Sequence, residues 1–237
     1  MSASVQITFV IGSIIMLAAG IVFWMMTRST PKDQHHHGVV AMTIVFVAFA
    51  NYFAMALGQG HVQFDGRDVF FARYTDWLIT TPILLASLAM MASDSIAKIR
   101  TLVFALVAAD VYMILTGLVG DFSNAPYNYY WWIISMVAFL AMLYMIWVPL
   151  QAKAHDGIHG STFKTMATIL TVLWICYPIV WLIGSSGFSI ISLTLESWLY
   201  LILDVCAKVG FGFVALSAVR KGTQHSSNQY SGARQYG

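Results

Sequence analysis

Long apolar segments separated by short polar connections run through almost the whole chain. An apolar run of about 20 residues is long enough to cross a lipid bilayer as an α-helix. The helices that these runs predict are Val5–Thr27, Val39–Gly58, Val69–Ala92, Ile99–Leu118, Tyr129–Leu150, Phe163–Ile183 and Leu193–Val219. The pattern therefore predicts an all-α membrane protein, built as a bundle of seven transmembrane helices.

Basic residues predict how the helices are oriented. Of the 12 lysines and arginines, Arg73 and Lys208 lie inside predicted helices and Arg67 lies alone on one side. The others flank the opposite side: Arg28, Lys32, Lys98, Arg100, Lys153, Lys164, Arg220, Lys221 and Arg234. Because loops rich in lysine and arginine face the cytoplasm, we expect the N-terminus outside, the C-terminus in the cytoplasm, and the plasma membrane as the location.

Composition agrees with a membrane protein and excludes several functions. Charged residues make up 9% of the chain, whereas a soluble domain carries about 25%. The net charge of +2 and the lack of a long basic run argue against nucleic-acid binding. We expect residues 1–221 to form one transmembrane domain and residues 222–237 to form a disordered cytoplasmic tail. We interpret the run His35-His36-His37 as a solvated loop, because no neighbours complete a tetrahedral metal site.

Two ionisable residues, Asp204 and Lys208, lie in the middle of the seventh predicted helix. A charge at that depth is costly, which makes it a functional candidate. The four-residue spacing places both side chains on one helical face, where carboxylate and amine can neutralise each other. A structural ion pair that joins two helices is the alternative interpretation.

A polar stripe follows one face of the third predicted helix. At about 100° per residue, Arg73, Asp76, Thr80 and Ser87 fall within roughly 60° of arc. We expect an ion pair between Arg73 and Asp76, and a hydrogen bond from Thr80 to Asp76. Such a stripe must face the bundle interior. Together with the aspartate and lysine of the seventh helix, it predicts a nearly neutral cluster of buried charges.

Large aromatic rings gather on the sixth predicted helix, where Trp174, Tyr177 and Trp181 share one face. With Trp77 from the third helix they form either ordinary core packing or the wall of a pocket for an elongated, conjugated apolar ligand. A buried lysine is also the side chain that condenses with an aldehyde to give an imine. Asp110, in the fourth helix, is expected to be protonated and hydrogen-bonded, because burial disfavours an unpaired carboxylate.

Three motifs together resemble the microbial rhodopsins and, among these, the bacteriorhodopsin-like proton pumps. The motifs are Arg73-Tyr-Thr-Asp76-Trp77 with Thr80-Thr81-Pro82, Trp174-Ile-Cys-Tyr177-Pro178-Ile-Val-Trp181, and Asp204-Val-Cys-Ala-Lys208-Val-Gly-Phe-Gly. The resemblance covers all seven helices in order.

The resemblance implies a role for each matching residue. Lys208 would carry all-trans retinal as a protonated Schiff base. Asp76 would be the primary counterion and proton acceptor, with Asp204 as the second counterion. Arg73 would gate the outward path, and Glu196 would belong to the proton-release group. The remaining residues that it assigns to the pocket or the counterions are Tyr52, Trp77, Leu84, Met113, Gly117, Phe139, Trp174, Tyr177, Pro178 and Trp181.

The chain departs from the pumps at several positions. Ser87 replaces their carboxylic proton donor, roughly 16 Å from Asp76 along the helix, so proton uptake would come through water or from a surface carboxyl such as Asp94. Ser186 replaces the second release carboxylate. Trp132 would fill the window that some relatives leave open for a carotenoid antenna.

The sequence therefore predicts a light-driven outward proton pump, a transporter rather than an enzyme, whose partners are lipid, protons and further copies of itself in a trimer or pentamer. A photosensory rhodopsin with a slow photocycle is the alternative, and the missing donor suits it. Leu170 and Ala207 argue against it, because sensors that couple to a transducer resemble one another in carrying Tyr and Thr there.

A chloride pump fits poorly, because Asp76 places a negative charge where the anion should sit. An animal-type receptor shares only the topology, and an unmodified Lys208 would leave a purely structural protein.

Overall fold

The computed structural model describes residues 1–93, 95–154 and 160–217. Seven helices in these residues are long and apolar enough to span a membrane, which confirms the predicted bundle. They are α1 (Ala3–Arg28), α2 (His35–Ala56), α3 (Phe71–Ala92), α4 (Ile96–Asp121), the span Tyr127–Ala154, α7 (Gly160–Ile183) and the span Leu193–Ser217. Asp94, the end of the seventh predicted helix at Val219, the basic residues Arg220, Lys221 and Arg234, and the predicted tail lie outside the described residues.

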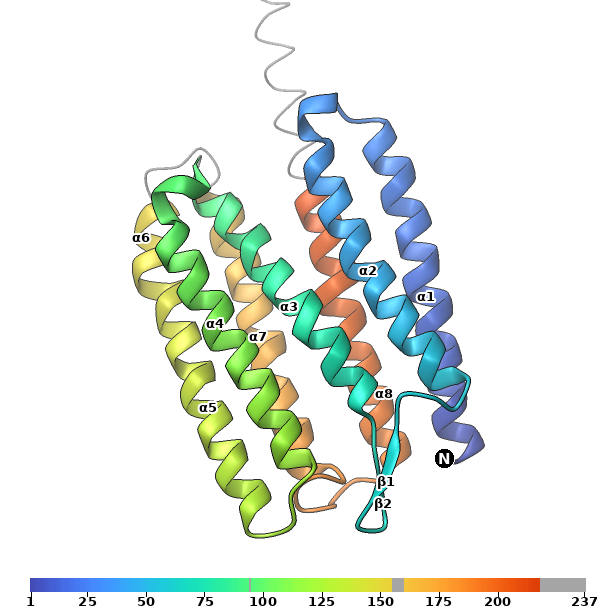
Figure 1. Ribbon diagram of the computed structural model, residues 1–237. Helices are drawn as coiled ribbons and strands as arrows, with labels where there is room; N and C mark the ends of the chain where they lie inside the picture. Colours follow the sequence, from blue (N-terminus) through green and yellow to red (C-terminus); the bar gives the residue numbers. More distant parts are fainter. Residues whose placement is uncertain (94, 155–159, 218–237) are drawn as a thin grey trace, which may run out of the picture.

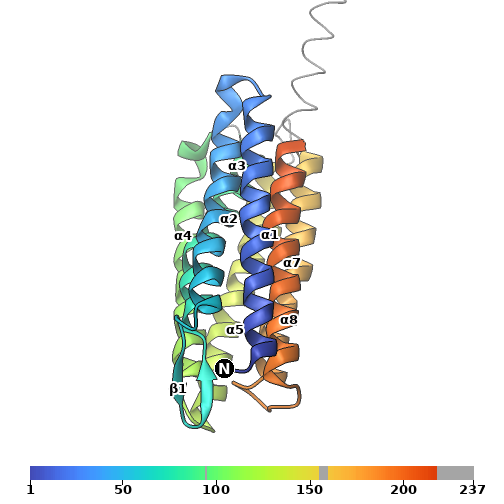
Figure 2. The ribbon, with the colours of Figure 1, turned by 90° about the vertical axis from the view of Figure 1, so that its right-hand side faces the viewer.

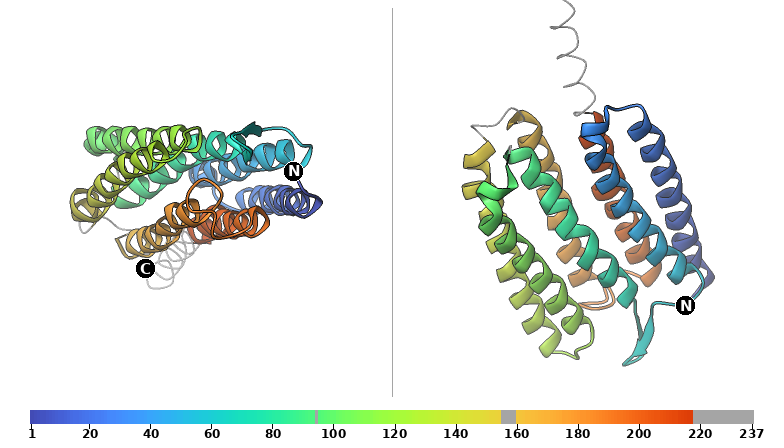
Figure 3. Two further views of the ribbon diagram at one scale, coloured as in Figure 1. Left: turned by 90° about the horizontal axis from the view of Figure 1, so that it is seen from below. Right: turned by 45° about the horizontal axis from the view of Figure 1, so that its top comes forward.

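The helices form two facing rows when the bundle is seen along its axis (Figure 3). Helices α2, α3 and α4 lie in one row, and α7, α8 and α1 lie in the other. Neighbours in sequence contact one another, α1 contacts α8 to close the ring, and α3 contacts α7 across the middle. Figure 2 shows the closed side, where α1 stands beside α8. Residues that α2, α3, α7 and α8 turn inward therefore meet in one interior.

A short β-hairpin connects α2 to α3. Strands β1 (Val62–Phe64) and β2 (Arg67–Val69) pair antiparallel with Phe64 opposite Arg67. The two turn residues, Asp65 and Gly66, have φ angles of 49° and 78°, as an Asp-Gly hairpin turn requires. The third predicted helix was therefore placed two residues too early, and the Asp-Gly signal for the hairpin was present in the sequence.

Two of the spans contain a π-helical turn. In the fifth span, η2 (Ile146–Leu150) separates α5 (Tyr127–Met145) from α6 (Gln151–Ala154), and it contains Pro149, which cannot donate a backbone hydrogen bond. In the seventh span, α8 (Leu193–Asp204) continues into η3 (Val205–Gly210), which contains Lys208. Single π turns inside helices occur frequently at functional sites.

The histidine run is not a loop. His35, His36 and His37 form the first turn of α2, after a short 3₁₀ turn at Lys32–Gln34. Hydropathy placed the helix start at the first apolar residues, but polar side chains are tolerated in a helical turn outside the bilayer core. No group of three or more metal-ligating side chains occurs in the described part of the chain.

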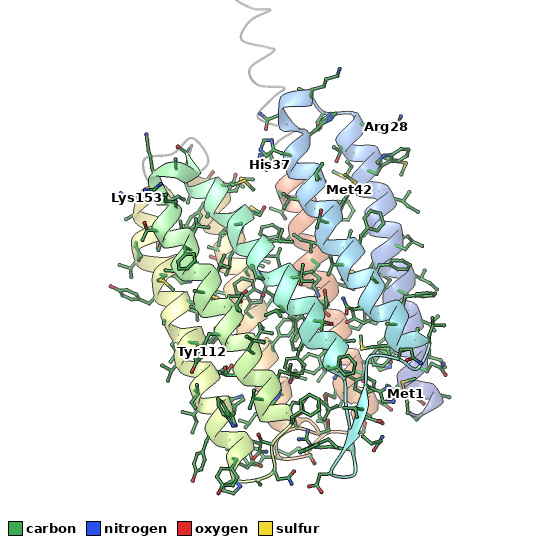
Figure 4. The ribbon with its side chains drawn as sticks, viewed as in Figure 1. Met1, Arg28, His37, Met42, Tyr112 and Lys153 are labelled. Atoms are coloured by element: carbon green, nitrogen blue, oxygen red, sulfur yellow. The ribbon has the colours of Figure 1, made fainter. Side chains whose placement is uncertain are left out.

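The two ends of the bundle differ in charge. Figure 4 shows Arg28 and Lys153 at one end and Met1 at the other, where Figure 1 places the hairpin. We call these the basic end and the hairpin end. Side chains such as Ile14, Phe104 and Leu140 are more than 60% exposed around the bundle, as expected for a surface covered by lipid. Which end faces the cytoplasm stays a prediction from the basic residues.

Candidate functional site

A buried lysine between two buried aspartates lies at the centre of the bundle. Lys208 is 2% exposed, and its Nζ atom lies 2.5 Å from Asp76 Oδ2 and 2.9 Å from Asp204 Oδ1. The predicted pairing within the seventh helix is therefore confirmed, and α3 contributes the second carboxylate. Paired charges of this kind can persist in a low-dielectric interior.

The two carboxylates have different hydrogen-bond partners. Asp204 accepts from Tyr52 Oη at 2.8 Å, Tyr177 Oη at 2.7 Å and Trp77 Nε1 at 3.2 Å, in addition to its contact with the lysine. Asp76 Oδ2 contacts the lysine, but Asp76 Oδ1 is buried and has no donor among the described side chains and backbone groups. The oxygens of Asp204 are therefore occupied by several donors, whereas one oxygen of Asp76 is left without one.

The predicted ion pair between Arg73 and Asp76 is wrong. The Arg73 guanidinium turns toward the hairpin end, where it donates to Glu196 Oε1 at 3.1 Å and to Ser197 Oγ at 2.8 Å. The spacing of the two residues along α3 fixes a shared face, but a long side chain can reach a different turn of a neighbouring helix. Glu196 also accepts from the backbone N–H of Ser185 at 2.8 Å. The charges thus form a lysine–aspartate group and a separate arginine–glutamate pair, instead of one cluster of four.

The predicted hydrogen bond from Thr80 to Asp76 is confirmed. The Thr80 hydroxyl donates to the backbone carbonyl of Asp76 at 2.9 Å, as threonine commonly does inside helices. The predicted orientation of the polar stripe is confirmed, because Arg73, Asp76, Thr80 and Ser87 are all buried. Ser87 lies nearer the basic end, in a helical segment whose neighbouring side chains belong to the apolar core.

An apolar cavity lies next to the charged group, and large aromatic side chains make up much of its wall, as is usual for a small-molecule site. Of the residues assigned to a pocket by resemblance, those that line it are Trp77, Met113, Gly117, Phe139, Trp174, Tyr177, Pro178 and Trp181. Tyr52 and Leu84 are not in the cavity wall: Tyr52 binds Asp204, and Leu84 is buried in the adjoining core. Trp77 and Tyr177, whose ring centroids are 5.3 Å apart, join the cavity to the charged group.

Several cavity residues were not predicted as pocket residues. They are Tyr74, Thr81, Asp110, Ile114, Trp132, Ser135, Met136 and Tyr200. Tyr74 lies three residues before Trp77, on the same face of α3, and that spacing is a signal that could have identified it. Tyr74 Oη accepts from Trp181 Nε1 at 3.0 Å. Trp132 closes the wall by donating to the Pro178 carbonyl at 3.2 Å.

Asp110 has the hydrogen bond that the sequence predicted for it. Its Oδ2 atom accepts from Thr81 Oγ1 at 2.7 Å, and the residue is fully buried in the cavity wall. Among the described residues no cation forms an ion pair with Asp110, and Lys208 pairs with Asp76 and Asp204 instead. Asp110 therefore does not belong to the charged group around the lysine.

A second buried cluster at the hairpin end was not predicted. Arg67, on β2, donates to Asp121 Oδ1 at 2.6 Å and to the Asp121 carbonyl at 2.5 Å. Ser186 donates to the same carboxylate, and Asn128 donates to the Ser186 carbonyl at 3.0 Å. Ser186 stands where the related pumps have a second release carboxylate. In this structure its hydroxyl instead contacts the carboxylate of Asp121, on α4. This cluster holds the hairpin, α4 and the turn between α7 and α8 together.

Replacing Asp121 by asparagine should destabilise the hairpin end. The change leaves the Arg67 guanidinium without its carboxylate, at a cost of about 2 kcal/mol, so we expect the thermal midpoint of the purified protein to fall by about 4–8 °C. Asp65→Asn, at the exposed hairpin turn, is the control and should change stability by at most about 0.5 kcal/mol. Equal midpoints for the two variants would contradict the assignment of a stabilising cluster.

The protein is a membrane protein with seven spanning helices. They surround a buried, ion-paired lysine and an aromatic cavity, an arrangement typical of an interior site that binds a cofactor. The family model described as "Bacteriorhodopsin-like protein" matches residues 3–222. The chain belongs to this family: it is a microbial, or type 1, rhodopsin and a multi-pass protein of the plasma membrane.

Individual relatives agree with this assignment. The chain is 37% identical over 218 residues to Archaerhodopsin-2 of Halobacterium sp. (strain aus-2), with 87% of this chain and 82% of the relative covered. It is similar to the crystal structure of thermophilic rhodopsin from Rubrobacter xylanophilus, with a TM-score of 0.89 and 39% identity over 91% of this chain and 96% of that one. It is also similar to Coccomyxa subellipsoidea Rhodopsin CsR, described as a light-driven proton pump, with a TM-score of 0.84 and 31% identity over 91% and 97% of the two chains.

Proposed function

We propose that the protein is a light-driven outward proton pump with all-trans retinal bound to Lys208. The observation that carries this proposal is the position of Lys208 Nζ between Asp76 and Asp204, beside a cavity walled by aromatic rings. The similarity to Coccomyxa subellipsoidea Rhodopsin CsR, whose description is that of a light-driven proton pump, supports the same activity.

The residues present fit a retinal group. Lys208 is the buried lysine of the described chain, and its amine lies where Trp77 and Tyr177 meet the charged group. The cavity wall is almost entirely aromatic and aliphatic, as a conjugated hydrocarbon requires. When bound, retinal supplies light absorption and a protonated imine nitrogen whose hold on its proton weakens after illumination.

The proton acceptor of this proposal is Asp76. It lies 2.5 Å from the lysine nitrogen, and its second oxygen has no donor among the described residues. Asp204 is less suited to accept, because its oxygens already accept hydrogen bonds from three side-chain donors. The fixed donors of Asp204 keep a negative charge beside the nitrogen while the proton moves to α3.

The route from Asp76 toward the hairpin end passes Arg73 and Glu196. Both residues are buried, and the guanidinium carbon lies 4.8 Å from the ring centroid of Tyr200 and 4.9 Å from that of Phe70. A new proton on Asp76 weakens the electrostatic pull of that aspartate on the arginine. Movement of the guanidinium would then favour proton loss from the hairpin end, which we place outside the cell.

Illumination of cells or proteoliposomes that contain the pigment tests the pump directly. Moving one charge out against 100 mV requires about 2.3 kcal/mol, which a photon supplies easily. We expect spheroplasts to acidify the medium in the light, and a protonophore to abolish the change. A coloured protein that produces no such change would contradict the pump.

A photosensor is the second candidate, and Ser87 is the observation that favours it. This buried serine, at the position where pumps have a carboxylic donor, cannot supply a proton as an acid near neutral pH. Slow proton return without net transport would suit signalling. Against it, Leu170 and Ala207 are small or aliphatic, fully buried residues at the positions where sensors carry Tyr and Thr.

Replacing Ser87 by aspartate should accelerate recovery of the dark state. A positioned general acid typically speeds proton transfer by about 10²-fold or more. Flash photolysis should therefore show that the state in which the Lys208 nitrogen has lost its proton decays faster by about that factor. Azide, a small diffusing acid, should accelerate the wild type and have little effect on Ser87→Asp. Ser87→Asn, of similar size but without an acid, is the matched control and should stay slow and azide-sensitive. Unchanged decay in Ser87→Asp would show that proton uptake is not limiting.

A further inference from the structure

Among the described residues, helix α1 contributes no side chain to the wall of the cavity. One of its glycines, Gly12, nevertheless packs against the ring of Tyr52, which binds Asp204 of the charged group. A Cβ atom on Gly12 would lie 2.3 Å from Tyr52 Cδ1, 2.7 Å from Cε1 and 3.0 Å from Cγ. Real Cβ atoms essentially never approach a ring so closely. The ring of Tyr52 therefore occupies the space that any other residue at position 12 would need.

Tyr52 cannot yield to a new methyl group without moving its hydroxyl. The side chain is 3% exposed, and its ring meets Phe9 edge-on with 6.3 Å between centroids. The hydroxyl donates to Asp204 Oδ2 at 2.8 Å. A tyrosine has two soft side-chain torsions and a rigid ring, so a displacement at Cδ1 and Cε1 is transmitted to the oxygen at the end of the ring.

We propose that Gly12 is a positioning residue for the counterion group: its missing side chain lets Tyr52 hold Asp204. The inference rests on the proposed retinal function only for its readout. The charged and titratable groups that face Asp204 come from α2, α3, α7, α8 and η3. They are Tyr52, Asp76, Tyr177, Tyr200 and Lys208. Among their contacts with Asp204, the bond from Tyr52 is the one that a side chain at position 12 would strain.

The experiment uses the colour of the reconstituted pigment as it is titrated with acid. Protonation of the carboxylates beside the cationic nitrogen changes the absorption band, and a weaker hydrogen bond to a carboxylate makes protonation easier. We expect Gly12→Ala to move the acid transition up by about 1 pH unit, and Tyr52→Phe to move it by about 1–2 pH units. The double variant should titrate like Tyr52→Phe alone, because both changes act through one hydroxyl.

Gly20→Ala is the matched control. Gly20 lies on the same helix, and a Cβ atom there would lie 2.8 Å from the ring of Phe46, a side chain that is 40% exposed on the surface of the bundle. We expect both alanine variants to lower the thermal midpoint of the retinal-free protein, and only Gly12→Ala to move the acid transition. This separates a positioning role from simple crowding between helices.

The outcomes decide the matter separately from the proposed function. A wild type that forms no pigment would overturn the retinal function itself. A coloured wild type with an unmoved transition in Gly12→Ala, or with a further shift in the double variant, would overturn the inference about Gly12. If Gly12→Ala alone forms no pigment, adding Tyr52→Leu should restore colour by removing the clash, and failure to restore it would also overturn the inference.

Discussion

Replacing Lys208 by alanine should abolish the visible absorption band that we expect retinal to form with the wild-type protein. The ε-amine is the group that retinal requires for an imine, and the described interior contains no second buried lysine that could replace it. Loss of the band should be complete. Absorption spectra of purified protein, recorded after incubation with all-trans retinal in the dark, measure it.

The alanine variant also leaves two buried aspartates without their cation, and removing one partner of a buried pair typically costs about 3–5 kcal/mol. A colourless sample could then be an unfolded one. Lys208→Arg is the control, because it retains a cation near Asp76 and Asp204 but forms no comparable imine. We expect Lys208→Arg to be helical by circular dichroism and colourless. A visible band in either variant would contradict the assignment of Lys208.

The sequence predicted the seven spans because a bilayer imposes a length and an apolar composition that can be read locally. Helical spacing likewise predicted that the α3 stripe is buried and that Asp204 and Lys208 pair. These features depend on contacts within one helix or on which face turns inward. They follow from the helical repeat without knowledge of the neighbouring helices.

The errors in the charged clusters concern contacts between distant parts of the chain. Arg73 pairs with Glu196, 123 positions away, instead of with its neighbour on α3. The bond from Arg67 to Asp121 spans 54 positions, and the ring of Tyr52 beside Gly12 is likewise set by how α1 packs on α2. A helical wheel gives the face of a residue, but it does not say how far a long side chain reaches or which helix stands opposite.

Replacing Asp76 by asparagine should stop proton export while leaving a coloured protein. The amide is similar in size to the carboxylate but cannot accept the proton of the nitrogen that lies 2.5 Å away. We expect light-driven acidification by proteoliposomes or spheroplasts to fall to the background of retinal-free samples. We also expect the band to move to longer wavelength, because the negative charge that stabilises the cationic nitrogen in the dark is removed.

Asp110→Asn provides the matched control for this change. Asp110 is also a fully buried aspartate inside the bundle, and it lines the same cavity, but its partner is Thr81 and not the lysine. If position relative to the nitrogen is what matters, the variant should export protons within about twofold of the wild type, because an amide oxygen can still accept from Thr81. Equal loss of export in both variants would mean that any buried carboxyl near the cavity is required, and the special role of Asp76 would be lost. Export that survives only in Asp110→Asn would identify the carboxylate facing Lys208 as the group that receives the proton.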